Sequence, residues 1–269
     1  RPPCIVRKSD GAALYATSDL ATIVEREKLY KPDTYIYLAD KRQELHFTQV
    51  FRTAKKAGIV RPDVNMTFVG FGTMNGKDGK PFKTRSGGVM RLEHLIADID
   101  NAVLNKIKEN RSVSDEEAEE TSKIVGLAAL KYGDLSNQAS KDYVFDIDRF
   151  ASFEGNTGPY ILYTIVRIKS ILAKYKENGG SSENINILPA KEASEKTLAL
   201  SLIKFSDVIE SAYKDNAPHR ICQYIYEVSN EFNVFYHNTK ILAEENEEQK
   251  KGYICLLYTS DAADERSSV

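Results

Sequence analysis

Four polar residues that could bind a small polar ligand stand near the starts of two predicted helices. Asp19 comes four residues after Tyr15 and follows a short apolar run, Ala13–Ala16, while Gln43 and His46 follow the next strand-like run. A carboxylate at the carboxyl edge of a parallel sheet faces the ligand crevice, where it can hold a guanidinium group through two hydrogen bonds. The amide and the imidazole can bind other polar groups of the ligand. Two alternatives remain open: Asp19 as a helix N-cap, and an ordinary polar helix start at the second position.

A glycine-rich basic loop is the feature that points most directly to phosphate chemistry. It runs from Gly76 to Gly88. The segment from Lys77 to Arg91 contains five basic residues and one acidic residue, Asp78. A flexible backbone with clustered cations suits a polyphosphate. The pattern GxxxxGK[ST] is absent, so the loop is not a P-loop. The alternative is a solvated basic loop without a ligand.

Basic and aromatic residues also occur on the helices of the second half, where Arg167, Lys169, Lys174 and Tyr163 stand among apolar residues. Tyrosine and arginine can stack on unpaired RNA bases. An exposed helical face is the alternative interpretation.

The elements that must position these residues fall into two groups. In the first, strand-like runs alternate with helical spacing, which predicts a parallel sheet with crossover helices and hence an α/β domain. The predicted strands are 13–16, 35–38 and 66–71, and the predicted helices are 19–30 and 43–57. Helices are next expected at 91–108 and, from the capping box Ser114–Glu117, up to Lys131, with an extended run at 143–150.

From Tyr160 onward the pattern predicts only helices, and therefore an all-α bundle. Amphipathic spacing covers 160–178, 192–215 and 218–244, and Pro159 suits the first turn of the first helix. We predict domains at 1–150 and 155–257, followed by an unstructured tail at 258–269. The tail is small, polar and acidic after Tyr258, so it is expected to lack packing partners.

Composition sets broad limits. A chain of 269 residues with 42% hydrophobic residues is expected to form two soluble domains. The net charge of −2 argues against a broad nucleic-acid-binding field but leaves local basic patches open. Cys4, Cys222 and Cys255 form no CxxC pair, so neither zinc nor disulfides are expected, in keeping with a reducing cytosol. No run approaches the roughly 20 apolar residues of a membrane span. The chain opens with Arg1 rather than Met and without a basic-then-apolar leader, and a fragment is expected.

Together these segments resemble the arginyl-tRNA synthetases, over about residues 1–257. Residues 10–21 are similar to the family's DGxxxYxxxDxA segment, and 39–48 to its strand-to-helix segment carrying Gln and His. Residues 74–88 resemble the loop that this family has in place of the KMSKS signature. Residues 155–173 and 231–242 are similar to its helical anticodon domain, named for the DALR motif. The resemblance implies a partial class I Rossmann-like catalytic domain followed by a helical-bundle anticodon-binding domain.

The resemblance also implies roles for individual residues. Tyr15, Asp19 and Gln43 would bind arginine, and His46 would lie near the adenosine of ATP. The loop would cover the ATP phosphates with Lys83 and Arg85 as catalytic cations. The ATP-binding loop residues implied in this way are Phe82, Lys83, Thr84, Arg85 and Ser86.

Three features depart from the family pattern. Ser18 stands where the family usually has arginine before the aspartate. The class I HIGH motif is missing, because none of His46, His94, His219 and His237 completes it. The tail after Leu257 does not follow the family and is interpreted as foreign sequence.

The implied reaction is the activation of arginine with ATP and its transfer to tRNA(Arg) by a cytoplasmic, monomeric ligase. Mg²⁺ would arrive with ATP, no dedicated protein metal site is expected, and tRNA would have to be bound before arginine is activated. Without the HIGH motif, the chain alone is expected to bind tRNA weakly but not to aminoacylate it. Alternatives are another ATP-using α/β enzyme with a helical appendage, a non-catalytic RNA-binding module, or a broken copy.

Overall fold

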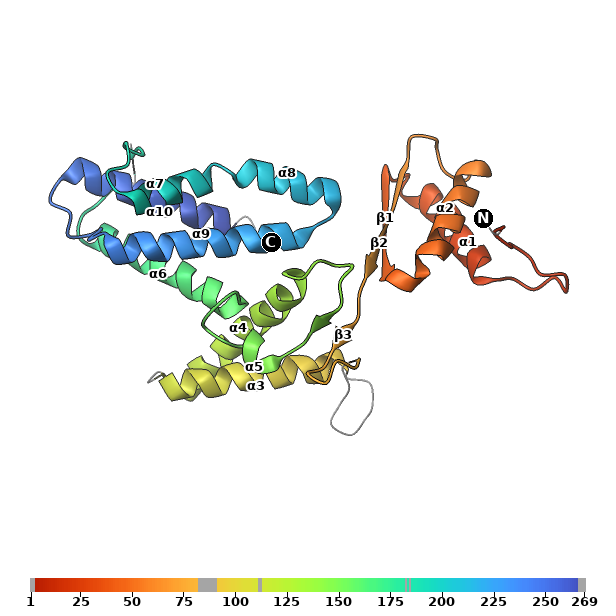
Figure 1. Ribbon diagram of the computed structural model, residues 1–269, viewed down its shortest axis with the longest axis horizontal. Helices are drawn as coiled ribbons and strands as arrows, with labels where there is room; N and C mark the ends of the chain where they lie inside the picture. The colour runs from red at the N-terminus through yellow and green to blue at the C-terminus, as the bar shows by residue number, and fades with distance from the viewer. Residues whose placement is uncertain (1–2, 82–90, 111–112, 182, 184, 266–269) are drawn as a thin grey trace. The chain divides into compact units, whose positions relative to one another are not determined.

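The chain forms two compact units, shown in the computed structural model in Figure 1. The structure describes residues 3–81, 91–110, 113–181, 183 and 185–265. The first unit comprises Arg1–Asn75 with Ala139–Tyr143, and the second comprises Gly76–Gln138 with Val144–Val269.

The first unit is a parallel β–α–β arrangement with one further helix. Strands β1 (Thr34–Asp40) and β2 (Asn65–Phe71) pair in parallel, with Tyr35 opposite Met66. They are connected by the 3₁₀ helix η1 (Lys41–Gln43) and by α2 (Glu44–Lys56). The two predicted strands, the helix between them and the parallel pairing are confirmed.

Helices α1 (Tyr15–Leu29) and α2 cover one face of this sheet. Ile23 of α1 and Val50 of α2 are fully buried, and they pack in one core with Tyr35 of β1. On the opposite face of β1, Ile36 and Leu38 are 57% and 66% exposed. The alternation of side chains along the strand therefore buries one set under the helices and leaves the other exposed.

The prediction of a strand at 13–16 is wrong. Residues 7–13 form a tight hairpin, in which Arg7 bridges Ala13 in antiparallel fashion, and helix α1 already begins at Tyr15. The turn depends on Gly11, whose φ of +86° is open to glycine at little cost. The Asp10 side chain accepts a hydrogen bond from the Ala12 N–H at 3.0 Å. The pair Asp-Gly is a common hairpin signal, and it was not used in the prediction.

The second unit is almost entirely helical. Its helices are α3 (Leu92–Asn110), α4 (Asp115–Leu135), α5 (Ile147–Phe150), α6 (Gly158–Glu177), α7 (Ala193–Leu202), α8 (Phe205–Asp215), α9 (Pro218–Asn238) and α10 (Glu247–Glu265). Its core joins α6, α7, α9 and α10 through Ile168, Leu198, Phe232 and Ile254, each at most 1% exposed. The two short strands β3 (Met74–Asn75) and β4 (Tyr143–Val144) lie where the chain passes between the units. The predicted fold class, α/β followed by an all-α bundle, is confirmed.

Helix starts follow the expected chemistry. Ser114 caps α4 by accepting a hydrogen bond from the Glu117 N–H at 3.2 Å, as the capping box predicted. Thr157 caps α6 by accepting from the Tyr160 N–H at 3.3 Å, and Pro159 lies in the first turn.

Three predicted elements have different bounds. The segment 192–215 forms two helices, α7 and α8, broken at Ile203 and Lys204. Both pack on α9, so the apolar spacing continues through the break without a Gly or Pro to mark it. Helix α9 ends at Asn238 because Thr239 is extended, and 143–150 contains the short helix α5.

The prediction that 258–269 lacks packing partners is wrong for its first residues. Helix α10 continues to Glu265, Tyr258 packs against the bundle core, and Ser260 is fully buried. The buried residues Leu256 and Leu257 hold the preceding turn, and a helix that is already formed extends at little cost through the next residues, which include Ala262 and Ala263. Its foreign origin stays a prediction, as do the domain boundaries.

Candidate functional site

The starts of α1 and α2 lie together and bring two of the predicted site residues into contact. His46 Nε2 lies 2.6 Å from Asp19 Oδ2, although the two residues are 27 positions apart. Each side chain is 31% exposed, so the pair is partly shielded and still reachable by a ligand. Structure thus joins two groups that the sequence placed only on separate helices.

Packing beneath the pair holds it in place. Phe47, next to His46, is buried in the core between α2 and the sheet. The His46 ring meets the Phe47 ring edge to face with centroids 5.1 Å apart. On α1, Leu20 next to Asp19 is buried in the same core. Each polar residue of the pair therefore has a neighbour in sequence that anchors its helix to the core.

Tyr15 and Gln43 lie one helical turn before the members of this pair. Tyr15 is the first residue of α1 and is 87% exposed, and its spacing of four puts it on the same face as Asp19. Gln43 is exposed at the end of η1, three residues before His46. The interpretation of Asp19 as an N-cap is wrong, because Leu14 occupies that position and Asp19 lies inside the helix.

The contact between Asp19 and His46 changes what each group can do. A guanidinium bound through two hydrogen bonds uses both oxygens of a carboxylate. One oxygen of Asp19 is already in contact with His46, so an incoming cation has to share that oxygen or displace the imidazole. Asp19, which is expected to bind arginine, and His46, which is expected to lie near ATP, are therefore in direct contact.

Ion pairs at the end of β1 were not foreseen from the sequence. The Asp40 carboxylate accepts from the Arg42 N–H at 2.9 Å and from its guanidinium at 2.8 and 2.6 Å, which lowers the pKa of Asp40 to about 2. Lys41 pairs with Asp142 at 2.8 Å, and the Thr73 N–H donates to the same carboxylate oxygen. The spacing Asp-x-Arg at a helix start could have indicated the first pair; nothing local indicates the second.

The predicted phosphate-binding residues Phe82, Lys83, Thr84, Arg85 and Ser86 lie outside the described residues. The start of their loop is described and forms a tight turn. The Gly76 N–H donates to the Lys80 carbonyl at 2.8 Å, and Gly79 has a φ of +73°. Lys77 pairs with Asp146 Oδ2 at 3.2 Å.

Arg167 of α6 lies between two tyrosine rings, one from α6 and one from α9. The Arg167 guanidinium carbon is 4.8 Å from the Tyr163 ring centre and 5.0 Å from that of Tyr236. Arg167 donates to Asn233, whose amide donates to the Tyr160 hydroxyl at 2.9 Å. We call Tyr163, Arg167, Asn233 and Tyr236 the arginine–tyrosine cluster. Tyr163 and Tyr236 are 39% and 38% exposed, so flat rings and a planar cation face solvent together.

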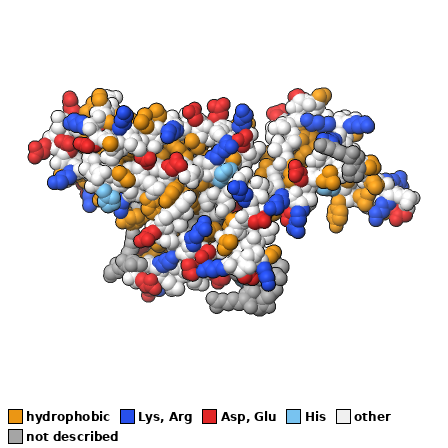
Figure 2. All heavy atoms as spheres, in the orientation of Figure 1, with side chains coloured by type: hydrophobic (Ala, Val, Ile, Leu, Met, Phe, Trp, Pro, Cys, Tyr) orange, Lys and Arg blue, Asp and Glu red, His pale blue; other side chains and the backbone are white. Residues whose placement is uncertain are grey.

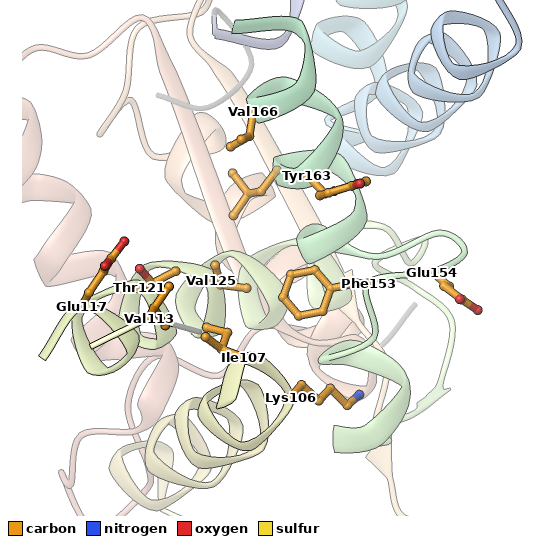
Figure 3. A pocket seen from close by; sticks show the side chains of 11 residues that line it. Lys106, Ile107, Val113, Glu117, Thr121, Val125, Phe153, Glu154, Tyr163 and Val166 are labelled. Atoms are coloured by element: carbon orange, nitrogen blue, oxygen red, sulfur yellow. The ribbon is translucent and has the colours of Figure 1, made fainter. Parts of the chain in front are cut away.

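A hollow of about 510 Å³ adjoins this cluster on the other side of Tyr163. It lies between α3, α4 and α6, with Phe153 of the α5–α6 connection near its centre (Figure 3). Its walls are mainly aliphatic, from Ile107, Val125 and Val166 among others. Of the predicted arginine- and ATP-binding residues that the structure describes, none lines it.

Charge is spread rather than concentrated. On the face shown in Figure 2, basic and acidic side chains are interspersed, in keeping with the net charge of −2.

Within the described part of the chain, no group of three or more His, Cys, Asp or Glu could hold a metal ion. Among the described helices, none is long and apolar enough to cross a membrane.

A parallel β–α–β unit with polar side chains at its helix starts, followed by a helical bundle with solvent-facing aromatic and basic residues, fits a class I aminoacyl-tRNA synthetase architecture. The family "tRNA synthetases class I (R), catalytic domain" matches residues 1–147, and the DALR anticodon binding domain matches residues 161–259. The chain belongs to the arginyl-tRNA synthetase family.

Comparison with individual relatives gives the same family. The chain is 65% identical over 264 residues to the arginine–tRNA ligase of Agathobacter rectalis and 58% identical over 256 residues to that of Alkaliphilus oremlandii. Each match covers 95% of this chain but only 44% and 43% of the relative, so the chain spans less than half of their length.

Solved structures show the same fold. The arginyl-tRNA synthetase of Plasmodium falciparum matches with a TM-score of 0.81 at 25% identity, over 97% of this chain and 45% of that one. The Thermus thermophilus enzyme matches with 0.80 at 19% identity, over 98% and 49%.

Proposed function

We propose that this chain is part of an arginine–tRNA ligase, which activates arginine with ATP and transfers it to tRNA(Arg). Family membership supports the reaction class, and the meeting of Asp19 and His46 at the helix starts supports the site. The complete protein would carry out the reaction, because the relatives are more than twice as long as this chain. A monomer in the cytoplasm is part of the proposal.

Arginine recognition is assigned to Tyr15, Asp19 and Gln43. Asp19 would bind the guanidinium group, with Tyr15 on the same helix face one turn earlier. Gln43 would supply an amide to the polar end of the substrate. His46 would lie toward ATP. Because His46 contacts Asp19, binding of one substrate would change the affinity for the other.

The chemical step would be in-line attack of an arginine carboxylate oxygen on the α-phosphorus of ATP. The bond from that phosphorus to the bridging oxygen breaks, and pyrophosphate leaves with the electron pair. A ribose hydroxyl at the tRNA terminus then attacks the activated carbonyl and releases AMP. Little covalent work falls to the protein, so positioning and cationic stabilisation carry the catalysis.

Lys83 and Arg85 would supply that stabilisation as the catalytic cations, with Phe82, Thr84 and Ser86 completing the ATP-binding loop. Mg²⁺ would arrive on the ATP phosphates and neutralise part of their charge. The described residues hold no carboxylate cluster suited to a dedicated metal site, so no step is assigned to a protein-bound ion.

The arginine–tyrosine cluster would meet unpaired bases of the tRNA. Tyrosine rings and a guanidinium plane stack on bases, and on the face shown in Figure 2 the basic side chains are interspersed with acidic ones. This cluster also favours a second candidate function, an RNA-binding module without catalysis, because it lies wholly within the helical unit.

Arginine-dependent exchange of pyrophosphate into ATP, measured in the complete protein with tRNA present, tests the proposal. Exchange should require arginine and should fail with citrulline, which has nearly the same shape but no guanidinium charge. Tight tRNA binding without any exchange would reject the ligase and leave the RNA-binding module. Equal exchange with citrulline would reject the role of Asp19.

A further inference from the structure

The short helix α5, with its N-cap Asp146, contacts both the start of the basic loop and helix α3, which follows that loop in the sequence. On the near side, Lys77 Nζ lies 3.2 Å from Asp146 Oδ2 and 3.8 Å from Asp148 Oδ2. On the far side, Lys106 of α3 donates to the Asp148 backbone carbonyl at 3.0 Å. Lys77 before the catalytic part of the basic loop and Lys106 after it therefore both contact α5 or its N-cap.

Asp146 is built to hold its partner. Its side chain is 24% exposed, against 66% for Lys77, and its other oxygen accepts the Asp148 N–H at 3.1 Å. A carboxylate fixed by a backbone donor loses less freedom on pairing than one on a free side chain. The Lys77 end is fixed too, because the turn from Gly76 to Lys80 is closed by the Gly76 N–H and by Lys80 N–H donation to Asp78.

Helix α5 is itself fixed to the bundle. The Phe150 ring packs edge to face on Phe145 at 4.7 Å, and a Cβ on Gly133 of α4 would lie only 2.3 Å from that ring. The connection after α5 then enters α6 directly, where Thr157 accepts from Tyr160 and donates to the Ser152 carbonyl at 2.6 Å. Helix α5 therefore contacts the start of the basic loop and α3, and its connection leads directly into α6, the helix that carries Tyr163 and Arg167 of the arginine–tyrosine cluster.

We propose that Asp146 is a positioning residue for arginine activation, acting through Lys77 to hold the base of the basic loop against α5. This inference rests on the proposed function, in which the loop carries the catalytic cations. Lys77 is then the lysine of this loop that binds protein, not phosphate. Loss of the pair should free the turn from Gly76 to Lys80 from its contact with the N-cap of α5, which lowers turnover while leaving tRNA contacts unchanged.

The test uses the complete protein with Lys77→Ala, Asp146→Asn and both together. Asparagine keeps the helix-capping ability of Asp146 and removes its charge. We expect the exchange kcat to fall roughly fivefold in each single variant, the size of an exposed ion pair. The double variant should be no worse than either single one, and the swapped pair Lys77→Asp with Asp146→Lys should recover most of the rate. The arginine KM and the tRNA Kd should stay within about twofold.

Lys108→Ala is the matched control, because Lys108 also forms an exposed ion pair, with Asp115 at 2.8 Å in the same unit. Its exchange rate should be unchanged. If Lys77→Ala keeps full kcat while Lys83→Ala loses it, the positioning role is wrong and the proposed function stands. If Lys83→Ala also keeps full kcat, the proposed role of the loop fails. Equal losses in kcat and tRNA affinity would also overturn the positioning role.

A second measurement needs no activity and uses this 269-residue chain itself. Acetylation with an amine-reactive ester, followed by mass spectrometry, compares Lys77 with Lys80 in the same turn. Lys77 should react several times more slowly, and Asp146→Asn should remove the difference. Equal rates for the two lysines in the unchanged chain would overturn the inference.

Discussion

The polar pair of the α/β unit and the arginine–tyrosine cluster of the helical unit are held in different ways. Asp19 and His46 meet directly across two short helix starts, and each is anchored by a single buried neighbour. Arg167 instead lies on the long helix α6 and contacts Tyr163 of the same helix and Asn233 and Tyr236 of the long helix α9, and the inner faces of both helices belong to one continuous core.

This difference suits the two proposed tasks. A pair that is one-third exposed and has few constraints can rearrange when a charged substrate enters. A stacked cluster on rigid helices presents a preformed surface to RNA, so little entropy is lost on binding. Under the proposed function, activation of a small molecule favours a site that can rearrange, whereas recognition of RNA favours a surface that is already formed.

The largest expected effect is on the bundle core that supports the arginine–tyrosine cluster. Phe232→Ala removes a fully buried ring from the bundle core and should lower the free energy of unfolding of the helical unit by about 3–5 kcal/mol. Val234→Ala, on the same helix but 53% exposed, should cost less than about 0.5 kcal/mol. Denaturant titration followed by circular dichroism measures both. Equal losses would mean that α9 does not pack as described.

The next effect separates chemistry from RNA binding. In the complete protein, Lys83→Ala and Arg85→Ala should each lower the exchange kcat by about 100-fold, the usual size for a cation acting on transition-state charge. ATP KM and tRNA Kd should change far less. Steady-state exchange kinetics with filter binding give all three values. A variant with raised ATP KM and normal kcat would make the loop a ground-state clamp.

The Asp19–His46 pair is tested by comparing its two members. Asp19→Asn should raise the arginine KM about 30-fold, because an unpaired guanidinium in a partly shielded site costs at least about 2 kcal/mol. His46→Gln should change the ATP KM more than the arginine KM. Exchange kinetics decide between them, with thermal melting to verify folding. If both variants shift only the melting temperature, the pair is structural and not a substrate site.

A smaller effect is expected at the cluster itself. Arg167→Ala should weaken tRNA binding about tenfold, in the range measured for losing one stacked base. Lys174→Ala removes another exposed cation of α6 and is the control, expected within about twofold. Filter binding at two salt concentrations separates stacking from charge, because loss of a phosphate contact lowers the salt dependence. Identical behaviour of the two variants would contradict stacking by Arg167.

The smallest effect concerns acid pH at the end of β1. Arg42 lowers the pKa of Asp40 to about 2, so its contribution to stability is present above the ordinary value of 3.8 and is lost as the pH falls toward 2. Arg42→Ala should return the pKa of Asp40 toward 3.8, which NMR titration of the carboxyl carbon reports. A pKa that stays near 2 would assign the shift to the backbone donor alone.

Much of the architecture follows from local sequence. The strand-like runs at 35–38 and 66–71 and the helical spacing between them predict a parallel pair, because a crossover helix is the usual connection of parallel strands. Ser114 and Thr157 cap the starts of α4 and α6, as hydroxyl side chains commonly do at helix N-termini. Motif spacing alone also placed Tyr15, Asp19, Gln43 and His46 near helix starts.

Only the tertiary structure decided which of these groups touch. The pairs Asp19–His46, Lys77–Asp146 and Arg167–Asn233 join residues 27 to 69 positions apart, and their meeting depends on how whole elements pack. The break between α7 and α8 and the continuation of α10 past Tyr258 have the same origin, because burial against a neighbouring helix outweighs local propensity. Sequence determined which chemical groups this protein holds and on which elements, and packing determined their partners.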